Sequence, residues 1–170
     1  KDGKPFKTRE GGVMRLQYLL ESVNEEMLKK ITENQKAKEN LEISGEEAKE
    51  TAKMIALAAI KYGDLSNQAS KDYIFDIDRF TSFEGNTGPY ILYTIVRIKS
   101  ILNKYQETQA ETALEDAKIL PAVGNAEKDL MLRLARFNDV MENAFAETAP
   151  HKICQYIYEL SNAFNSFYHD

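Results

Sequence analysis

The sequence predicts an all-α protein, a bundle of helices preceded by a short extended N-terminal segment. Apolar residues recur every three or four positions through most of the chain, which is the period of an amphipathic helix. Serine, threonine and proline, which favour helix starts, stand before several of these periodic segments. The one strand-like alternation after the N-terminus, residues 73–78, is too short to form a sheet.

The first helix is expected over residues 13 to about 32, after a turn formed by two consecutive glycines. Its apolar residues fall at helical spacing: Leu16, Leu19, Leu20, Val23, Met27, Leu28 and Ile31. A polar stretch follows, and the apolar period lapses near Asn40. We therefore expect two domains, residues 1–40 and residues 41–170.

Ser44 and Glu47 form a capping box in front of the second expected helix, which continues to about Tyr62. Gly63 suits its C-cap, because glycine adopts the left-handed backbone there without a steric penalty. Four apolar residues are spaced to contact a partner helix closely: Met54, Ile55, Ala58 and Ala59. We expect this helix to contact its neighbour through that side.

A further helix is expected from Thr87, a good N-cap, to about Tyr105, with Pro89 in the first turn. Four apolar residues form one narrow stripe, which predicts the core side of this helix: Ile91, Ile95, Ile98 and Leu102. The opposite side carries aromatic and polar side chains: Tyr93, Arg97, Ser100 and Lys104.

The C-terminal part predicts one or two helices between Asn125 and Glu147, and a last helix from Ala149 to the chain end. That last helix carries one apolar stripe: Ile153, Ile157, Leu160, Phe164 and Phe167. The chain opens without methionine, and the stripe continues almost to Asp170 without a C-cap. We therefore expect a fragment of a longer protein, truncated at its C-terminus.

Composition is typical of a cytoplasmic protein, with 43% hydrophobic and 29% charged residues. No apolar run approaches the roughly 18 residues of a membrane span, and no leader opens the chain, so we expect no membrane partner. The single cysteine, Cys154, excludes an internal disulfide and is expected to be a small buried residue. His151 and His169 have no carboxylate or cysteine at ligand spacing, which predicts no metal site.

The net charge of −5 argues against indiscriminate binding to nucleic acid, because an acidic protein repels phosphate at long range. Acidic residues concentrate in residues 39–50 and residues 107–116. Such a chain can still recognise unpaired loop nucleotides by shape and base stacking. We therefore expect no DNA partner but leave RNA open.

Tyr93 and Arg97 stand at i, i+4 on one helix face, near enough to hold a planar base by stacking and the adjacent phosphate by charge. In a second interpretation, Tyr93 contacts a neighbouring helix and Arg97 forms a surface ion pair. From the residues alone the second interpretation is the more common one, since buried tyrosines are frequent.

Residues 72–100, DYIFDIDRFTSFEGNTGPYILYTIVRIKS, resemble the signature region of the anticodon-binding domain of arginyl-tRNA synthetases, which are class I aminoacyl-tRNA synthetases. Three other segments are similar to further parts of that family: residues 4–21 (KPFKTREGGVMRLQYLLE), residues 58–76 (AAIKYGDLSNQASKDYIFD) and residues 130–170. The first of these resembles the segment that closes the catalytic domain in bacterial members. The resemblance therefore covers nearly the whole chain.

The resemblance implies a helical bundle of the class I synthetase anticodon-binding type over residues 41–170, after the end of a catalytic domain in residues 1–40. It implies a tRNA-recognition role, with the anticodon loop of arginine tRNA and the catalytic domain of the parent chain as partners. The full enzyme would ligate arginine to its tRNA with ATP and magnesium. This chain lacks the His-apolar-Gly-His signature and the nucleotide-binding core, so by itself it is expected to be inactive and to need no cofactor.

Three residues match the family's positions that contact the anticodon loop: Tyr93 and Arg97 of PYILYTIVR, and Tyr168 of FNSFYHD. The resemblance also implies that PFKTREGG corresponds to the KMSKS loop, whose cations stabilise the triphosphate of ATP. Lys7, Thr8 and Arg9 depart from that pattern, so either cation is a candidate. Alternatively, these residues form only a basic, flexible terminus.

Two other classes of function remain open on the sequence. A helical protein-interaction module without RNA binding is compatible with the composition. An independent small enzyme is disfavoured, because the sequence offers no Ser-His-acid, Cys-His, metal-ligand or phosphate-loop constellation.

Overall fold

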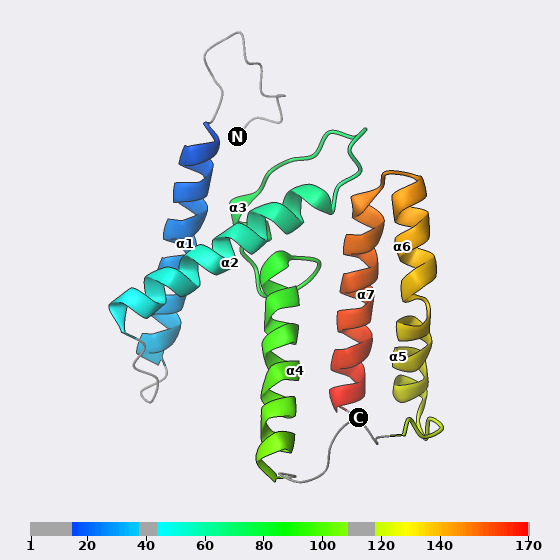
Figure 1. The fold of residues 1–170 in the computed structure, drawn as a ribbon. Helices are drawn as coiled ribbons and strands as arrows, with labels where there is room; N and C mark the ends of the chain where they lie inside the picture. The colour runs from blue at the N-terminus through cyan, green and yellow to red at the C-terminus, as the bar shows by residue number, and fades with distance from the viewer. Residues whose placement is uncertain (1–14, 38–43, 109–117, 170) are drawn as a thin grey trace. The chain divides into compact units, whose positions relative to one another are not determined.

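The computed structural model describes residues 15–37, 44–108 and 118–169, and every regular element in them is a helix (Figure 1). The helices are α1 (Leu16–Ala37), α2 (Gly45–Leu65), α3 (Ile77–Phe80), α4 (Gly88–Thr108), α5 (Asn125–Ala135), α6 (Phe137–Ala146) and α7 (Pro150–His169). The all-α prediction is confirmed. The expected extended N-terminal segment and the boundary near Asn40 lie outside the described residues.

The chain divides into two compact units, Lys1–Tyr90 and Ile91–Asp170. In the first unit α1 and α2 cross and bury one cluster between them (Figure 1). Its members are Val23 and Met27 of α1 and three small residues of α2, Ala52, Ala56 and Ala59. Alanine side chains let the two helix axes approach closely, so Val23 and Met27 are fully enclosed.

The predicted contact side of α2 is partly wrong. Ala59 is in the core, but Met54 is exposed. At 3.6 residues per turn Met54 lies about 200° around the helix from Ala52, on the far side from α1. Small residues, rather than the larger Met54, therefore define the contact with α1.

The two ends of α2 differ in how well they were predicted. Ser44 is confirmed as the N-cap, since its hydroxyl oxygen accepts a hydrogen bond from the Glu47 backbone N–H at 3.2 Å. Gly63 is not the C-cap, because α2 continues to Leu65. A Cβ atom on Gly63 would lie 3.0 Å from Cδ1 of Phe80, so any larger residue would have to displace the Phe80 ring by a few tenths of an ångström.

Residues 73–78 do not form one extended stretch, because the short helix α3 starts at Ile77. The Asp76 carboxylate accepts a hydrogen bond from the Arg79 backbone N–H at 3.2 Å, which caps this helix. The aspartate therefore stops the extended backbone in the middle of the predicted segment.

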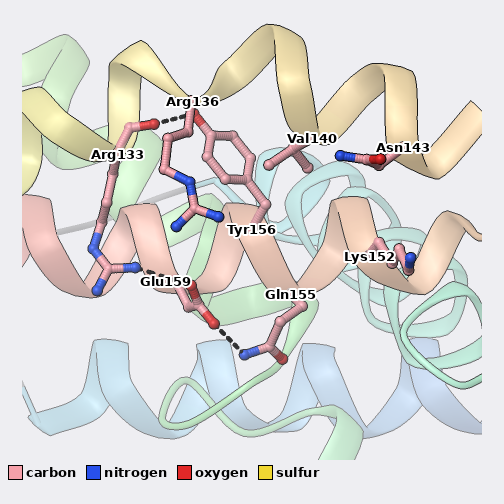
Figure 2. Close-up of a pocket in the computed structure, with 8 residues that line it drawn as sticks. All are labelled: Arg133, Arg136, Val140, Asn143, Lys152, Gln155, Tyr156 and Glu159. Atoms are coloured by element: carbon pink, nitrogen blue, oxygen red, sulfur yellow. Dashed lines mark hydrogen bonds and ion pairs between the residues drawn. The ribbon is translucent and has the colours of Figure 1, made fainter.

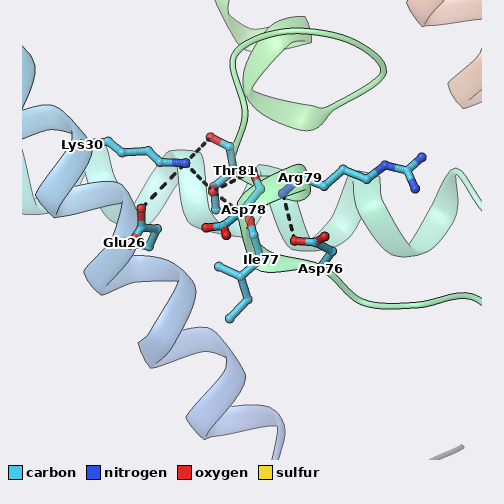
Figure 3. A network of polar contacts seen from close by, with 7 residues as sticks. All are labelled: Glu26, Lys30, Asp76, Ile77, Asp78, Arg79 and Thr81. Carbon is cyan, nitrogen blue, oxygen red and sulfur yellow. Dashed lines mark hydrogen bonds and ion pairs between the residues drawn. The ribbon is translucent and has the colours of Figure 1, made fainter. Parts of the chain in front are cut away.

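A polar network connects the end of α3 with α1 (Figure 3). The Lys30 ammonium donates to the Thr81 hydroxyl at 2.7 Å and to the Thr81 carbonyl at 3.3 Å, and it lies 3.8 Å from the Glu26 carboxylate. Thr81 is fully buried, so its hydroxyl needs such partners. The network fixes the C-terminal end of α3 against α1.

The start of α4 agrees with the prediction. The Thr87 hydroxyl accepts a hydrogen bond from the Tyr90 backbone N–H at 3.3 Å and donates to the Ser82 carbonyl at 2.6 Å. Pro89 is buried in the first turn, where its missing N–H costs nothing. Thr87 is therefore the N-cap of α4.

In the second unit α5 and α6 both lie beside α7 (Figure 1), so the region 125–147 forms two helices, as expected. The most buried side chains of α7 are Cys154, Tyr156, Ser161 and Ala163. The prediction for Cys154 is confirmed, and burial raises the pKa of its thiol. The predicted stripe of α7 is only half-buried, and Phe167 is exposed.

The predicted core stripe of α4 is only partly correct, because Ile91 and Ile98 are half-buried but the other two members are exposed. Ile95 and Leu102 are 41% and 46% exposed, whereas Thr94 is 2% exposed. Helix α4 meets α7 through Thr94 and Arg97, about a quarter turn from the apolar stripe. Polar contacts between these two helices therefore decide which side of α4 faces α7.

None of the described helices combines the length and the sustained apolar character that crossing a bilayer requires.

Candidate nucleic-acid interface

Helices α4 and α7 bring the three predicted site residues together within the second unit. The guanidinium carbon of Arg97 lies 4.7 Å from the centre of the Tyr93 ring and 5.0 Å from the centre of the Tyr168 ring. Both distances fit cation–π contacts. Arg97 thus contacts an aromatic ring of its own helix and one of α7.

Hydrogen bonds fix the Arg97 side chain as well. Its NH2 nitrogen donates to the Tyr93 hydroxyl at 2.6 Å, which the i, i+4 spacing on α4 allows. Its NH1 nitrogen donates to Asn165 Oδ1 at 2.6 Å, and His169 Nε2 lies 3.5 Å from the same nitrogen. A phenol, an amide and an imidazole carry no negative charge, so these partners do not cancel the charge of Arg97.

Asn165 is a member of the site that the sequence did not reveal. Its Nδ2 donates to the buried Thr94 hydroxyl at 3.2 Å while its Oδ1 accepts from Arg97. It therefore bridges the interior of the unit and the half-buried Arg97 side chain. Asn165 lies three residues before Tyr168, so both side chains fall on the same side of α7. The sequence does not show how α7 lines up with α4, so this spacing alone could not identify Asn165 as a partner of Arg97.

Both aromatic rings of the site are open to solvent. Tyr93 is 47% exposed and Tyr168 is 50% exposed. Tyr168 is supported from behind by Phe164, with ring centres 6.3 Å apart and planes inclined by 22°. Such half-exposed and supported rings offer faces on which a planar group can stack.

A surface pocket of about 320 Å³ adjoins these rings. Its lining residues are Tyr93, Val96, Arg97, Ser100, Ile101, Lys104 and Tyr168. Aromatic faces, two cations and a hydroxyl group are the chemistry that suits an unpaired nucleotide, with stacking for the base and positive charge for the phosphate.

The more common interpretation of the pair Tyr93 and Arg97 does not describe the observed geometry. Tyr93 is not buried against a neighbouring helix. Within the part of the chain that the structure describes, Arg97 forms no ion pair with a carboxylate. The arginine instead binds the two tyrosines and Asn165.

A second pocket of about 290 Å³ lies among α5, α6 and α7 (Figure 2). Arg133 forms ion pairs with Asp129 and Glu159, both at 2.9 Å, and these contacts, that with Asp129 foremost, raise the pKa of Arg133. The Tyr156 hydroxyl donates to the Arg133 carbonyl at 3.0 Å. The polar groups here mainly join α5 to α7, so the exposed aromatic pocket is the better candidate site.

The remaining predicted site residues, Lys7, Thr8 and Arg9, lie outside the described residues. No group of three histidine, cysteine, aspartate or glutamate side chains able to hold a metal occurs in residues 15–37, 44–108 and 118–169.

Family models match both parts of the chain. Residues 91–170 match the DALR anticodon binding domain, and residues 1–77 match the tRNA synthetases class I (R), catalytic domain. Together with the helical fold, these matches define a part of a class I aminoacyl-tRNA synthetase that includes catalytic-domain sequence and the anticodon-binding domain.

Relatives and solved structures identify the member of that class. Over its full length the chain is 72% identical to the arginine–tRNA ligase of Agathobacter rectalis and 54% identical to that of Alkaliphilus oremlandii. The chain belongs to the arginyl-tRNA synthetase family. It spans 28% and 27% of the length of these two relatives.

Two solved structures are similar in fold. The arginyl-tRNA synthetase of Plasmodium falciparum gives a TM-score of 0.75 at 27% identity, over 92% of this chain and 27% of that one. The Thermus thermophilus arginyl-tRNA synthetase gives a TM-score of 0.73 at 25% identity, over 94% of this chain and 25% of that one.

Proposed function

We propose that the second unit binds the anticodon loop of arginine tRNA, with unpaired bases stacked on Tyr93 and Tyr168. The observation that supports this most is the convergence of both rings and Arg97 on one exposed pocket. A stacked base contributes about 1–3 kcal/mol to binding. Two half-exposed rings can therefore supply much of the affinity of a loop-binding site.

We further propose that the whole protein ligates arginine to this tRNA in the cytoplasm, with ATP and magnesium. Within that protein, residues 1–40 would end the catalytic domain, and Lys7 or Arg9 would stabilise the triphosphate charge. The chain alone would bind tRNA without performing chemistry, and its other partner would be the catalytic domain of the parent protein. Family membership supports the proposed ligase activity. The match of residues 1–77 to the class I (R) catalytic domain supports a catalytic-domain origin for residues 1–40, and it extends further along the chain than residue 40.

A filter-binding titration of the 170-residue chain tests the RNA proposal. Transcripts of an arginine tRNA and of an unrelated tRNA are titrated at two salt concentrations. Selective retention of the arginine tRNA is expected. Retention of neither transcript would indicate a protein-interaction module, and equal retention would indicate generic RNA binding.

Replacing Tyr93 tests the site itself. Tyr93→Ala removes one stacking face and should weaken binding of arginine tRNA about tenfold or more. Tyr105→Ala is the matched control, because Tyr105 is similarly exposed on α4 but does not line the pocket. Equal affinity of the two variants would exclude Tyr93 from the site. Circular dichroism checks that both variants keep their helices.

A further inference from the structure

We infer that Lys104 makes the phosphate contact at this site and that Arg97 is a positioning residue, which holds the two tyrosine rings in place. This inference rests on the proposed RNA-binding function. It differs from the sequence-based expectation, in which Arg97 holds the phosphate.

The Arg97 guanidinium already has hydrogen-bond partners within the protein. One terminal nitrogen donates to Asn165 and the other donates to the Tyr93 hydroxyl, both at 2.6 Å. A phosphate held end-on by the guanidinium would approach those same two nitrogens. Binding a phosphate there would therefore compete with the bonds that fix the Tyr93 ring.

These hydrogen bonds form one continuous path from the interior of the second unit to the two tyrosine rings. Thr94 is buried and accepts from Asn165, which in turn accepts from Arg97. Arg97 then contacts both Tyr93 and Tyr168. A planar guanidinium can bond at two ends and cover two ring faces, which a lysine ammonium cannot do. Rings fixed in this way lose less freedom when a base stacks on them.

Lys104 lines the same pocket. It follows Tyr93 by eleven residues, so it lies about 20° from Tyr93 around the helix and about 16 Å along it. Lys104 is exposed, and its ammonium has no hydrogen-bond or ion-pair partner in the described ranges. A flexible, hydrated point charge at that place suits a phosphate further along the loop from the stacked base.

The test separates charge from position with three variants of the 170-residue chain. Lys104→Gln removes the proposed phosphate contact. Lys99→Gln removes an equal charge from an exposed position of α4 outside the pocket. Arg97→Lys keeps the charge but cannot bridge Asn165 and the tyrosines. Affinity for the arginine tRNA transcript is measured over a salt series, with the unrelated tRNA transcript in parallel.

We expect Lys104→Gln to reduce the slope of log affinity against log salt by about 0.7, the value for one phosphate contact on a single strand. It should keep the preference for arginine tRNA. Lys99→Gln should leave the slope unchanged. Arg97→Lys should keep the slope and weaken binding about tenfold, since the stacking faces lose their support.

Two results would overturn the inference while leaving the proposed function intact: equal slopes for Lys104→Gln and Lys99→Gln, or wild-type affinity for Arg97→Lys. Loss of preference for arginine tRNA in the wild-type chain would instead overturn the proposed function and this inference with it. Lys104 and Lys99 are exposed, so neither substitution removes a buried contact.

Discussion

Two tyrosine hydroxyls in this protein have opposite hydrogen-bonding roles, because one faces a cation and the other faces a carboxylate. The Tyr93 hydroxyl accepts a hydrogen bond from the cationic Arg97, whereas the Tyr73 hydroxyl donates to the Asp64 carboxylate at 2.8 Å. The first arrangement anchors a ring of the candidate site. The second places a phenol beside a negative charge, which disfavours its ionisation.

Partial burial, the hydrogen bond to Asp64 and the charge of that carboxylate raise the pKa of Tyr73 from 10.0 to about 12. Because the folded pKa is the higher one, this tyrosine stabilises the fold below pH 10, and the stabilisation is lost as the pH rises toward 12. An alkaline titration followed by tyrosinate absorbance checks this. The difference between wild type and Tyr73→Phe should titrate near pH 12. A midpoint near pH 10 would show that neither burial nor Asp64 shifts the pKa of this phenol.

At the scale of elements, the sequence located the helices well but not their contact faces. Caps and apolar period predicted the starts of α2 and α4, because these signals lie within a few consecutive residues. The buried side of α4 was partly misassigned, because it depends on the contact between Thr94 of α4 and Asn165 of α7. The apolar pattern of one helix does not show how that helix lines up with another. The same limit explains why Tyr93, Arg97 and Tyr168 were found by resemblance while Asn165 was not.

The glycines show the same limit. From sequence alone, a glycine that ends a helix cannot be told from a glycine that lets two elements approach closely. Gly63 lies inside α2 under Phe80, and Gly88 opens α4 against the backbone of α2. A Cβ atom on Gly88 would lie 2.6 Å from the carbonyl carbon of Ala58 and 2.9 Å from the nitrogen of Ala59. Backbone atoms cannot move aside as a flexible side chain can.

Gly88→Ala should therefore lower the free energy of unfolding by about 1–3 kcal/mol, the usual cost of overpacking. Gly45→Ala is the matched control, since Gly45 also starts a helix but a Cβ atom there would have nothing within 4 Å, and it should be neutral or stabilising by about 0.4–1 kcal/mol. Urea unfolding followed by circular dichroism measures both changes. Equal urea midpoints for Gly88→Ala and Gly45→Ala would show that the backbone of α2 shifts to accommodate the added methyl group.

At the scale of the whole molecule, the charge balance favours selective over general binding of nucleic acid. The chain carries 22 lysine and arginine residues against 27 aspartate and glutamate residues. In the second unit some of the cations are already paired, as Arg133 is with Asp129 and Glu159. Two cations, Arg97 and Lys104, line the aromatic pocket. Because so few phosphate contacts are available there, much of the affinity must come from stacking.

This balance predicts that duplex DNA competes poorly for the chain. Stacked base pairs cannot offer an unpaired base to Tyr93 or Tyr168, and the net charge of −5 opposes the approach of a phosphate duplex. With labelled arginine tRNA bound at physiological salt, about a hundredfold excess of unlabelled duplex DNA should leave most of the tRNA in place, because non-specific binding rests on phosphate contacts alone. The same excess of unlabelled arginine tRNA should displace it. Equal displacement by both competitors would show that phosphate attraction, and not the aromatic pocket, holds the RNA.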